Sequence, residues 1–387
     1  MKPIKHFIAL IAALSAPYIC SADSIDTGLL HQRLGIEATV AGVPGTNAYL
    51  RGENESGKKV SAYYGAAVRG DFSMDRSTRL GRLYPGVYQG LGLEFGSFVS
   101  GGLLGNPVSL YVYQGAVPLR IGKRLSLGYE WQFGAAMGWT HYRKDTDTDN
   151  IAVSTSVTAR MGLGIRLQYA LTERIALTAD VNATHFSNGN TSWPNRGVNM
   201  TGASIGVAYS LDRDSGTCDY VAEPFSPGWI YDITAYGAWR KRAVAIDGEA
   251  MMCPGKFGVA GLQFSPMRRF NQWFAAGASL DMQYDESACL AQYHVENTWG
   301  DDIKFYRPPF GKQLSIGVSA RAELIMPVFA INVGVGYDML SPGDNKRFYQ
   351  SLALKAFVTS KLFVNVGYRL GEFKDPQNMM LGLGVRL

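Results

Sequence analysis

The chain has little of what identifies most soluble enzymes or helical membrane proteins. It has four cysteines among 387 residues, and it lacks a Cys-x-x-Cys pair, a glycine-rich phosphate loop and an HExxH motif. Beyond the N-terminal segment, no apolar run approaches the roughly 20 residues that a transmembrane helix requires. The formal net charge of +5 is too diffuse to indicate nucleic-acid binding. The sequence therefore excludes a helical membrane protein and gives no support to phosphate-loop, zinc-protease or nucleic-acid chemistry.

The first 22 residues predict a secretory signal. Two lysines precede the apolar run 7–19, and cleavage is expected after Ala22. Lipid attachment at Cys20 is the weaker alternative, because Ile19 is bulkier than the residue that usually precedes a lipidated cysteine. The mature chain is then either soluble or crosses a membrane as β-strands, the other structure that satisfies backbone polar groups in hydrocarbon.

Sustained alternation of apolar with small or polar residues favours the membrane alternative. Successive side chains of a strand point to opposite faces, and residues 153–171 place valine, leucine, isoleucine and tyrosine on one face and serine, glycine, glutamine and arginine on the other. Residues 125–139 repeat the pattern. Such long alternation is typical of outer-membrane barrels, whereas strands of soluble sandwiches run to about 5–6 residues. The chain is expected to be an all-β, antiparallel transmembrane barrel.

The same pattern predicts about sixteen strands. They are expected over 31–42, 59–70, 86–98, 108–119, 124–141, 151–170, 174–187, 199–211, 228–240, 256–265, 272–284, 313–326, 328–339, 348–359, 362–371 and 377–387. Connections after odd-numbered strands tend to be the longer ones, so these are expected outside the cell. The long connection 212–227 breaks this rule and suggests a boundary between residues 23–211 and 212–387. We expect one wide barrel, with two eight-stranded barrels in tandem as the alternative.

A histidine and a serine continue the apolar face of the strand expected over 174–187. His185 and Ser187 follow Val181 and Ala183 at a spacing of two, so in a barrel they face lipid at the height of the outer leaflet. Imidazole can take the proton of a serine hydroxyl near neutral pH and make it a nucleophile. The alternative is that both are ordinary members of the interfacial belt of amphipathic side chains.

The residues around this pair resemble a known family. Segments 185–189 and 194–199 read HFSNG and PNRGVN, which is similar to the signature of the outer-membrane lipid A 3-O-deacylases. The resemblance covers about residues 31–211 and is most specific over 183–205, whereas the second half lies outside it. It implies an eight-stranded barrel with a lipid-facing catalytic pair. The substrate it implies is lipopolysaccharide, whose lipid A loses an ester-linked acyl chain. Other outer-membrane lipids are the further partners expected.

The resemblance also implies roles for single residues. His185 would be the general base, Ser187 the nucleophile, Asn188 an oxyanion donor and Gly189 its support. The family's third triad member is a glutamate, and Asn199 stands in its place here. A His-x-Ser pair followed by such an asparagine is similar instead to the outer-membrane phospholipase A family, which uses calcium. An asparagine can orient the imidazole but stabilises its charged form less than a carboxylate does, so we expect slower chemistry.

Several polar residues have simpler interpretations. Asp180 and Asn182 are expected to point into the barrel lumen. His141 is expected in the aromatic belt beside Trp139, and His294 is expected to be solvated in an outer loop. No cofactor is expected, apart from calcium under the phospholipase alternative.

The second half offers three further expectations. Asp281, Asp285 and Glu286 form an acidic group that we expect to be a solvated loop, with calcium binding as the alternative. Cys253 and Cys289 both fall in predicted outer loops, where a disulfide between them is one option. A non-enzymatic pore is a third functional class, and it would use the inward residues Arg321, Glu323, Lys355 and Arg369 to line a wet lumen.

Overall fold

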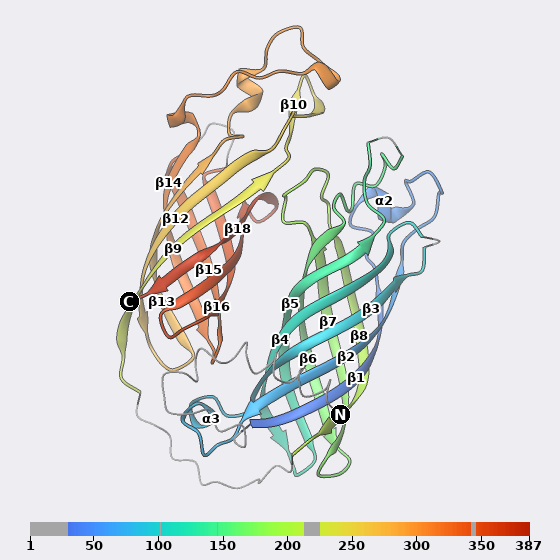
Figure 1. Ribbon diagram of the computed structural model, residues 1–387, viewed down its shortest axis with the longest axis vertical. Coiled ribbons are helices and arrows are strands. Elements are labelled where there is room, and N and C mark those ends of the chain that lie inside the picture. The colour runs from blue at the N-terminus through green and yellow to red at the C-terminus, as the bar shows by residue number, and fades with distance from the viewer. Residues whose placement is uncertain (1–29, 101, 145, 213–224, 342–345) are drawn as a thin grey trace. The chain divides into compact units, whose positions relative to one another are not determined.

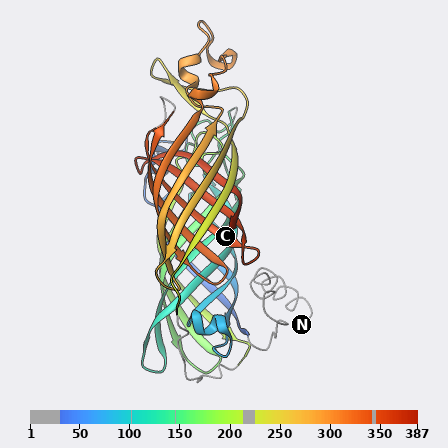
Figure 2. The ribbon, with the colours of Figure 1, turned by 90° about the vertical axis from the view of Figure 1, so that its left-hand side faces the viewer.

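The chain forms two closed antiparallel β-barrels of eight strands each, whose tilted strands are visible in Figures 1 and 2. The computed structural model describes residues 30–100, 102–144, 146–212, 225–341 and 346–387. Within these ranges no helix has the length and apolar character needed to cross a membrane. The expected signal segment 1–22 lies outside the described residues.

The first barrel is closed by its own first and last strands. It consists of β1 (Leu30–Gly42), β2 (Ala62–Met74), β3 (Val87–Phe98), β4 (Gly105–Ile121), β5 (Leu125–Trp139), β6 (Val157–Ala170), β7 (Ile175–Ser187) and β8 (Val198–Ser210). Each strand pairs with the next along the chain, and β1 pairs with β8. Two short helices, α2 (Ala48–Arg51) and α3 (Arg79–Leu83), lie in the β1–β2 and β2–β3 connections.

The second barrel closes in the same way, through pairing of β9 with β18. Its strands are β9 (Gly228–Arg240), β12 (Phe257–Arg269), β13 (Phe274–Asp285), β14 (Leu314–Ile325), β15 (Phe329–Leu340), β16 (Phe348–Phe357), β17 (Leu362–Gly371) and β18 (Asp375–Arg386). A hairpin of β10 (Ala243–Ile246) and β11 (Glu249–Met252) follows β9. The β13–β14 connection holds three short 3₁₀ turns, η2 (Leu290–Tyr293), η3 (Gly300–Asp302) and η4 (Phe310–Lys312).

The expectation of one wide barrel is wrong, although each expected strand has a counterpart. The edge of β8 is taken by β1, so it cannot pair with β9. An eight-stranded barrel has an interior just wide enough for side chains to fill, and each half supplies large inward side chains that do so. The alternation is the same in both kinds of barrel, so it could not reveal which edges meet.

Ion pairs fill the first barrel. Arg69 lies 2.6 Å from Glu130 and 3.0 Å from Glu37, and all three side chains are buried. Asp180 points inward as expected and lies 3.0 Å from Arg166. These charges lose their water on burial, so their pairing is what makes their presence in the lumen tolerable.

The outward surface of the first barrel is apolar. Ile36, Leu163, Val181 and Ile205 are each 63–70% exposed. A surface of exposed aliphatic side chains around a charged interior is the reverse of a water-soluble protein and is typical of an outer-membrane barrel.

The second barrel is filled rather than wet. Arg321, Glu323, Lys355 and Arg369 are at most 4% exposed. Lys355 lies 2.5 Å from Glu323 and 2.6 Å from Asp232, while Arg321 and Arg369 each pair with an aspartate. These four side chains therefore do not line the water-filled lumen that the pore alternative expected.

The acidic group at the end of β13 is not a solvated loop. Asp281 and Asp285 are 1% and 2% exposed, because β13 continues to Asp285 and both point into the barrel. Asp281 pairs with Arg321 at 2.8 Å, and Asp285 pairs with Arg240. Glu286 accepts a hydrogen bond from the backbone of the β12 strand.

No disulfide joins Cys253 to Cys289. Both cysteines are buried, and Cys253 packs with Val244 and Leu290 in a small apolar cluster. The Cys289 thiol donates to the carbonyl oxygen of Lys312. The pairing considered from the sequence is therefore wrong for these two residues.

The alternation of 125–139 places Trp139 on the lipid face, and this prediction is wrong. Trp139 is 6% exposed and packs inside the barrel. Gly138 has a left-handed φ of +97°, and the β4–β5 register shifts between Gly105 and Val108. Because side chains alternate with a period of two, one irregularity moves the next side chain to the other face.

The strand expected over 151–170 begins later than predicted. β6 starts at Val157, and the residues before it form a loop. Val153, expected on the lipid face, is 1% exposed. Its N–H donates to the side chain of Asn150 and its carbonyl accepts from Tyr142, so this backbone bonds within the loop instead of to a neighbouring strand.

Two histidines also differ from expectation. Because Trp139 points inward, it forms no lipid-facing belt with His141, whose Nδ1 lies 3.3 Å from the Trp139 carbonyl oxygen. His294 is half-buried rather than solvated. Its Nε2 lies 2.7 Å from the carbonyl oxygen of Thr298, and its ring packs edge-on against Trp299.

Candidate active site

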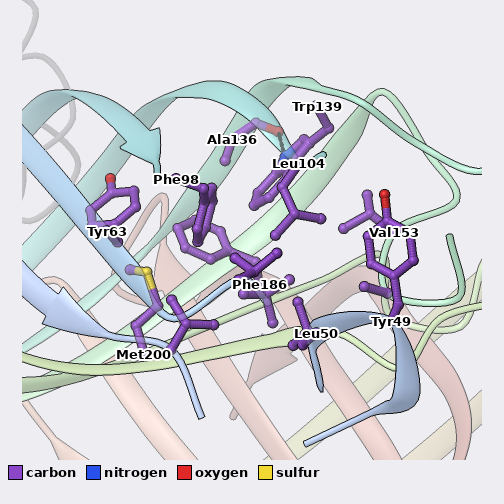
Figure 3. Packing of buried hydrophobic residues seen from close by; sticks show 14 of the residues in the cluster. Tyr49, Leu50, Tyr63, Phe98, Leu104, Ala136, Trp139, Val153, Phe186 and Met200 are labelled. Atoms are coloured by element: carbon purple, nitrogen blue, oxygen red, sulfur yellow. Dashed lines mark hydrogen bonds between the residues drawn. The ribbon is translucent and has the colours of Figure 1, made fainter. Parts of the chain in front are cut away.

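An apolar cluster fills the end of the first barrel that carries the longer connections (Figure 3). Phe186 of β7 lies in this cluster with no exposed surface, and its ring meets Trp139 edge-on at 5.1 Å. Because neighbours on a strand point to opposite faces, burial of Phe186 turns His185 and Ser187 away from the lumen. The sequence HFS thus fixes the direction of both polar side chains through the aromatic residue between them.

Asn199 is held beside His185 by the same rule. It stands between Val198 and Met200, which are 0% and 3% exposed and belong to the apolar cluster. In the β7–β8 register Asn199 is the direct partner of His185. The His185 Nδ1 and the Asn199 Oδ1 lie 2.7 Å apart. With the Nδ1–H donating to this oxygen, Nε2 carries the lone pair.

Ser187 has a partner that the sequence did not assign. The Asn195 Nδ2 donates to the Ser187 Oγ at 2.8 Å. The Asn195 Oδ1 accepts from the backbone N–H of Asn188 at 3.1 Å, which fixes the orientation of the amide. Asn195 lies in the β7–β8 connection, and its place in the PNRGVN segment was the only sequence signal for it.

Asn188 and Gly189 lie directly after Ser187. The Asn188 Nδ2 donates to the Ser154 Oγ at 2.9 Å, and its backbone N–H donates to Asn195. Gly189 adopts a left-handed φ of +64°, which glycine accepts without strain. Asn188 therefore anchors the connection through these contacts, and Asn195 is the side-chain donor at Ser187.

The segment that carries Asn195 is fixed from two sides. The backbone N–H groups of Arg196 and Gly197 donate to the carbonyl oxygens of Ile151 and Ala152, both at 3.0 Å. From the β1–β2 connection, the Asn47 Nδ2 donates to the Gly197 carbonyl oxygen at 3.2 Å. Three connections of the first barrel therefore meet at the candidate site.

Family models match most of the chain. The model described as lipid A 3-O-deacylase (PagL) matches residues 62–208, and the model described as acyloxyacyl hydrolase, C-terminal domain, matches residues 229–387. The chain belongs to the lipid A 3-O-deacylase family. Membership makes it an ester hydrolase of the outer membrane, in a family that deacylates lipid A.

Solved structures add only distant likenesses. The outer-membrane enzyme PagL is 14% identical with a TM-score of 0.31, and the match covers 44% of this chain and 97% of that one. The N-terminal β-barrel domain of Pseudomonas aeruginosa OprF is 16% identical with a TM-score of 0.26, covering 46% of this chain and 97% of that one. A comparison with curated proteins finds no match.

In this member of the family, a glycine lies directly against the candidate base. Gly197 has a left-handed φ of +69°, and a Cβ there would come within 2.8 Å of the His185 Cε1. Such a distance is too short for a real contact, so the imidazole occupies space that only glycine leaves open.

Where the resemblance to the family implies a glutamate beside the candidate base, the described residues place Asn199, whose Oδ1 lies 2.7 Å from the His185 Nδ1. Among the residues that the structure describes, no group of three or more histidine, cysteine, aspartate or glutamate side chains could hold a metal ion. Asn47, Ser154, Asn188, Asn195 and Asn199 each take part in hydrogen bonds at the candidate site, and all five side chains are neutral. This arrangement can orient an imidazole and donate hydrogen bonds to an oxygen anion.

Proposed function

We propose that the protein is a serine acyl hydrolase that removes an ester-linked acyl chain from lipid A. Ser187 is the nucleophile, His185 the general base and Asn199 the residue that orients the base. The observation that carries the proposal is the 2.7 Å contact between His185 and Asn199, on the outward face of β7 one alternation step from Ser187.

The proposed reaction proceeds through an acyl-enzyme. The His185 Nε2 takes the proton of the Ser187 hydroxyl while its oxygen attacks the ester carbonyl. The tetrahedral oxyanion collapses, and the proton on Nε2 passes to the departing alcohol of the sugar. His185 then takes a proton from water, which attacks the acyl-serine and releases the fatty acid. Ser187 recovers its proton in the last step, so the enzyme returns unchanged.

Asn195 is the proposed oxyanion donor. Its Nδ2 already lies 2.8 Å from the Ser187 Oγ, to which the carbonyl carbon becomes bonded. The contact from the Asn188 N–H to the Asn195 Oδ1 holds this amide before substrate arrives, and donors fixed in advance stabilise developing charge best. The backbone at Gly189 supports the same turn.

Asn199 makes a specific difference to the proposed rate. Its oxygen accepts the Nδ1–H and selects the tautomer with a free Nε2. It carries no negative charge to stabilise the imidazolium that forms during attack. The chemical step is therefore expected to be slower than with a glutamate at this position.

Substrate is proposed to enter sideways from the outer leaflet. Below His185 the outward face of β7 carries Ala183 and Val181, flanked across the β6–β7 pair by Leu163. Val181 and Leu163 are more than 60% exposed, so acyl chains already in the bilayer meet an apolar wall that leads to the catalytic pair. No channel through the lumen is needed.

Phospholipid is the second candidate substrate, and the asparagine at position 199 is the observation that favours it, because it resembles the outer-membrane phospholipase A pattern.

A direct test compares the two lipids. Lipid A and phospholipids from cells with and without the protein are analysed by mass spectrometry, together with the Ser187→Ala variant and, as a control, Ser97→Ala. Ser97 is exposed on β3 and bonds to Asn106, away from the candidate site.

The proposal expects lipid A lighter by one acyl chain in cells with the wild type and with Ser97→Ala, and intact lipid A with Ser187→Ala. Lysophospholipid in place of deacylated lipid A would assign the site to phospholipid. An acyl loss that persists in Ser187→Ala would refute the serine mechanism.

A further inference from the structure

The β13–β14 connection of the second barrel carries a run of exposed basic and aromatic side chains. Residues 303–312 read IKFYRPPFGK, with three cations and no acidic residue. The exposed basic and aromatic members of this run are Lys304, Tyr306, Arg307, Phe310 and Lys312. Tyr306 and Phe310 are each 65% exposed, an unusual degree for large aromatic side chains outside a lipid-facing surface.

The run is held in place by its buried members. Ile303 is 3% exposed, and Phe305 packs on the ring of His294 at 5.9 Å. The backbone N–H of Tyr306 donates to the Tyr293 carbonyl oxygen at 2.8 Å. The exposed side chains therefore project from an ordered connection, whose backbone need not be ordered again on binding.

A cation and an aromatic ring of the run adjoin a second aromatic ring on β13. Phe310 stacks on Tyr284 of β13 with centroids 5.4 Å apart and planes 19° from parallel. The Arg307 Nη2 donates to the Tyr284 hydroxyl at 3.3 Å. An extended aromatic face thus lies beside the guanidinium group of an exposed arginine.

The run lies on the outer side of the membrane by the topology of the second barrel. At one end of the second barrel the strands are joined by the short turns 270–273, 326–328 and 358–361. Short turns are periplasmic in outer-membrane barrels. The connection that holds the run is at the opposite end and extends beyond the strands (orange in Figure 1). The surface it meets there is the lipopolysaccharide leaflet.

We propose that this run, residues 303–312, binds the phosphorylated saccharide of lipopolysaccharide. Guanidinium and ammonium groups pair with phosphate oxygens, and exposed aromatic faces pack on the apolar faces of sugar rings. The acidic residues of the connection, Glu286, Glu296, Asp301 and Asp302, lie outside the run in the sequence. This inference goes beyond the proposed function, since it uses no residue of the catalytic pair.

The test measures binding of a delipidated, phosphorylated core oligosaccharide to the full-length protein in detergent micelles by calorimetry. Without acyl esters the probe cannot report on hydrolysis. Replacement of both Lys304 and Arg307 by Gln should weaken binding about tenfold or more, as expected for the loss of charge-assisted contacts. Tyr306→Ala should weaken it as well. The Ser187→Ala variant should bind as the wild type does, which separates this site from the proposed function.

Matched controls separate specific contact from net charge and from misfolding. Lys58 and Lys59 form an exposed basic pair in the β1–β2 connection, and replacing both by Gln removes the same charge without affecting the run. Circular dichroism verifies the fold of each variant. Unchanged affinity in the Lys304/Arg307 variant would overturn the proposal. So would equal binding of the dephosphorylated oligosaccharide, or competition by phosphatidylglycerol vesicles as strong as that by the saccharide.

Discussion

Replacement of Gly197 by alanine is the most direct test of the geometry around His185. A Cβ at this position would lie 2.8 Å from the His185 Cε1 and 2.9 Å from the Phe186 carbonyl oxygen. Both distances are shorter than real Cβ atoms accept. The carbonyl belongs to a strand and cannot move far, so the imidazole must shift by several tenths of an ångström.

Two costs of the change can be separated. The left-handed conformation at φ +69° costs an alanine about 1–2 kcal/mol of folding free energy wherever it occurs. Displacement of the base acts on catalysis instead, because a shift of about 1 Å in a reacting group can cost about 10²-fold in rate. We expect Gly197→Ala to lower kcat between about tenfold and a hundredfold, with KM little changed.

The control is Gly122→Ala. Gly122 has a φ of +63° in the β4–β5 turn, and a Cβ there meets nothing within 4 Å. Both variants are compared by deacylation of lipid A in micelles and by urea unfolding. Gly122→Ala should show the cost of the left-handed conformation alone, so Gly197→Ala should lose at least as much stability, and only Gly197→Ala should lose activity. If the two variants were equally active, the imidazole that rests against Gly197 would not be the catalytic base.

Three further predictions concern single contacts. Asn199→Leu removes the acceptor for the His185 Nδ1–H and should lower kcat by about 10²-fold or more, whereas Asn199→Glu should raise kcat above the wild type by stabilising the imidazolium; initial rates on lipid A decide both. Lys355→Met leaves two buried carboxylates with less positive charge, so urea unfolding should show a loss of about 3–5 kcal/mol; a neutral result would refute the pairing. Burial raises the pKa of the Cys253 thiol to about 11, so at pH 8 only about one thiol in a thousand is ionised. Mass spectrometry should find Cys253 unalkylated in the folded protein and alkylated after denaturation, and rapid labelling of the folded form would contradict its burial.

The positions of the strands could be predicted because alternation is a local property. Side chains alternate between the two faces of a strand, and Phe186, Val198 and Met200 point into the barrel. Their neighbours His185 and Asn199 must therefore point outward. The same local rule explains why Asp180 could be assigned to the lumen. Where each residue depends only on its neighbours along a regular strand, the sequence contains the information.

The failures occur where distant parts of the chain decide the structure. Trp139 turns inward because Gly138 adopts a left-handed conformation at a register shift. Val153 is buried because its segment folds over the barrel end. Asn195 reaches Ser187 from an irregular connection, where no period applies. Barrel closure depends on which two strand edges meet, and the alternation carries no record of that choice.

Because each barrel is closed by its own strands, such a chain can arise by fusion of two genes and can be divided again. Because β1 bonds to β8 and β9 bonds to β18, each cylinder satisfies its own ladders of hydrogen bonds. Division of the gene between the codons for residues 211 and 227 would leave no strand of either barrel without its two neighbouring strands. Fusion of two formerly independent genes, or loss of one half in a descendant, would thus require no repair of the remaining barrel.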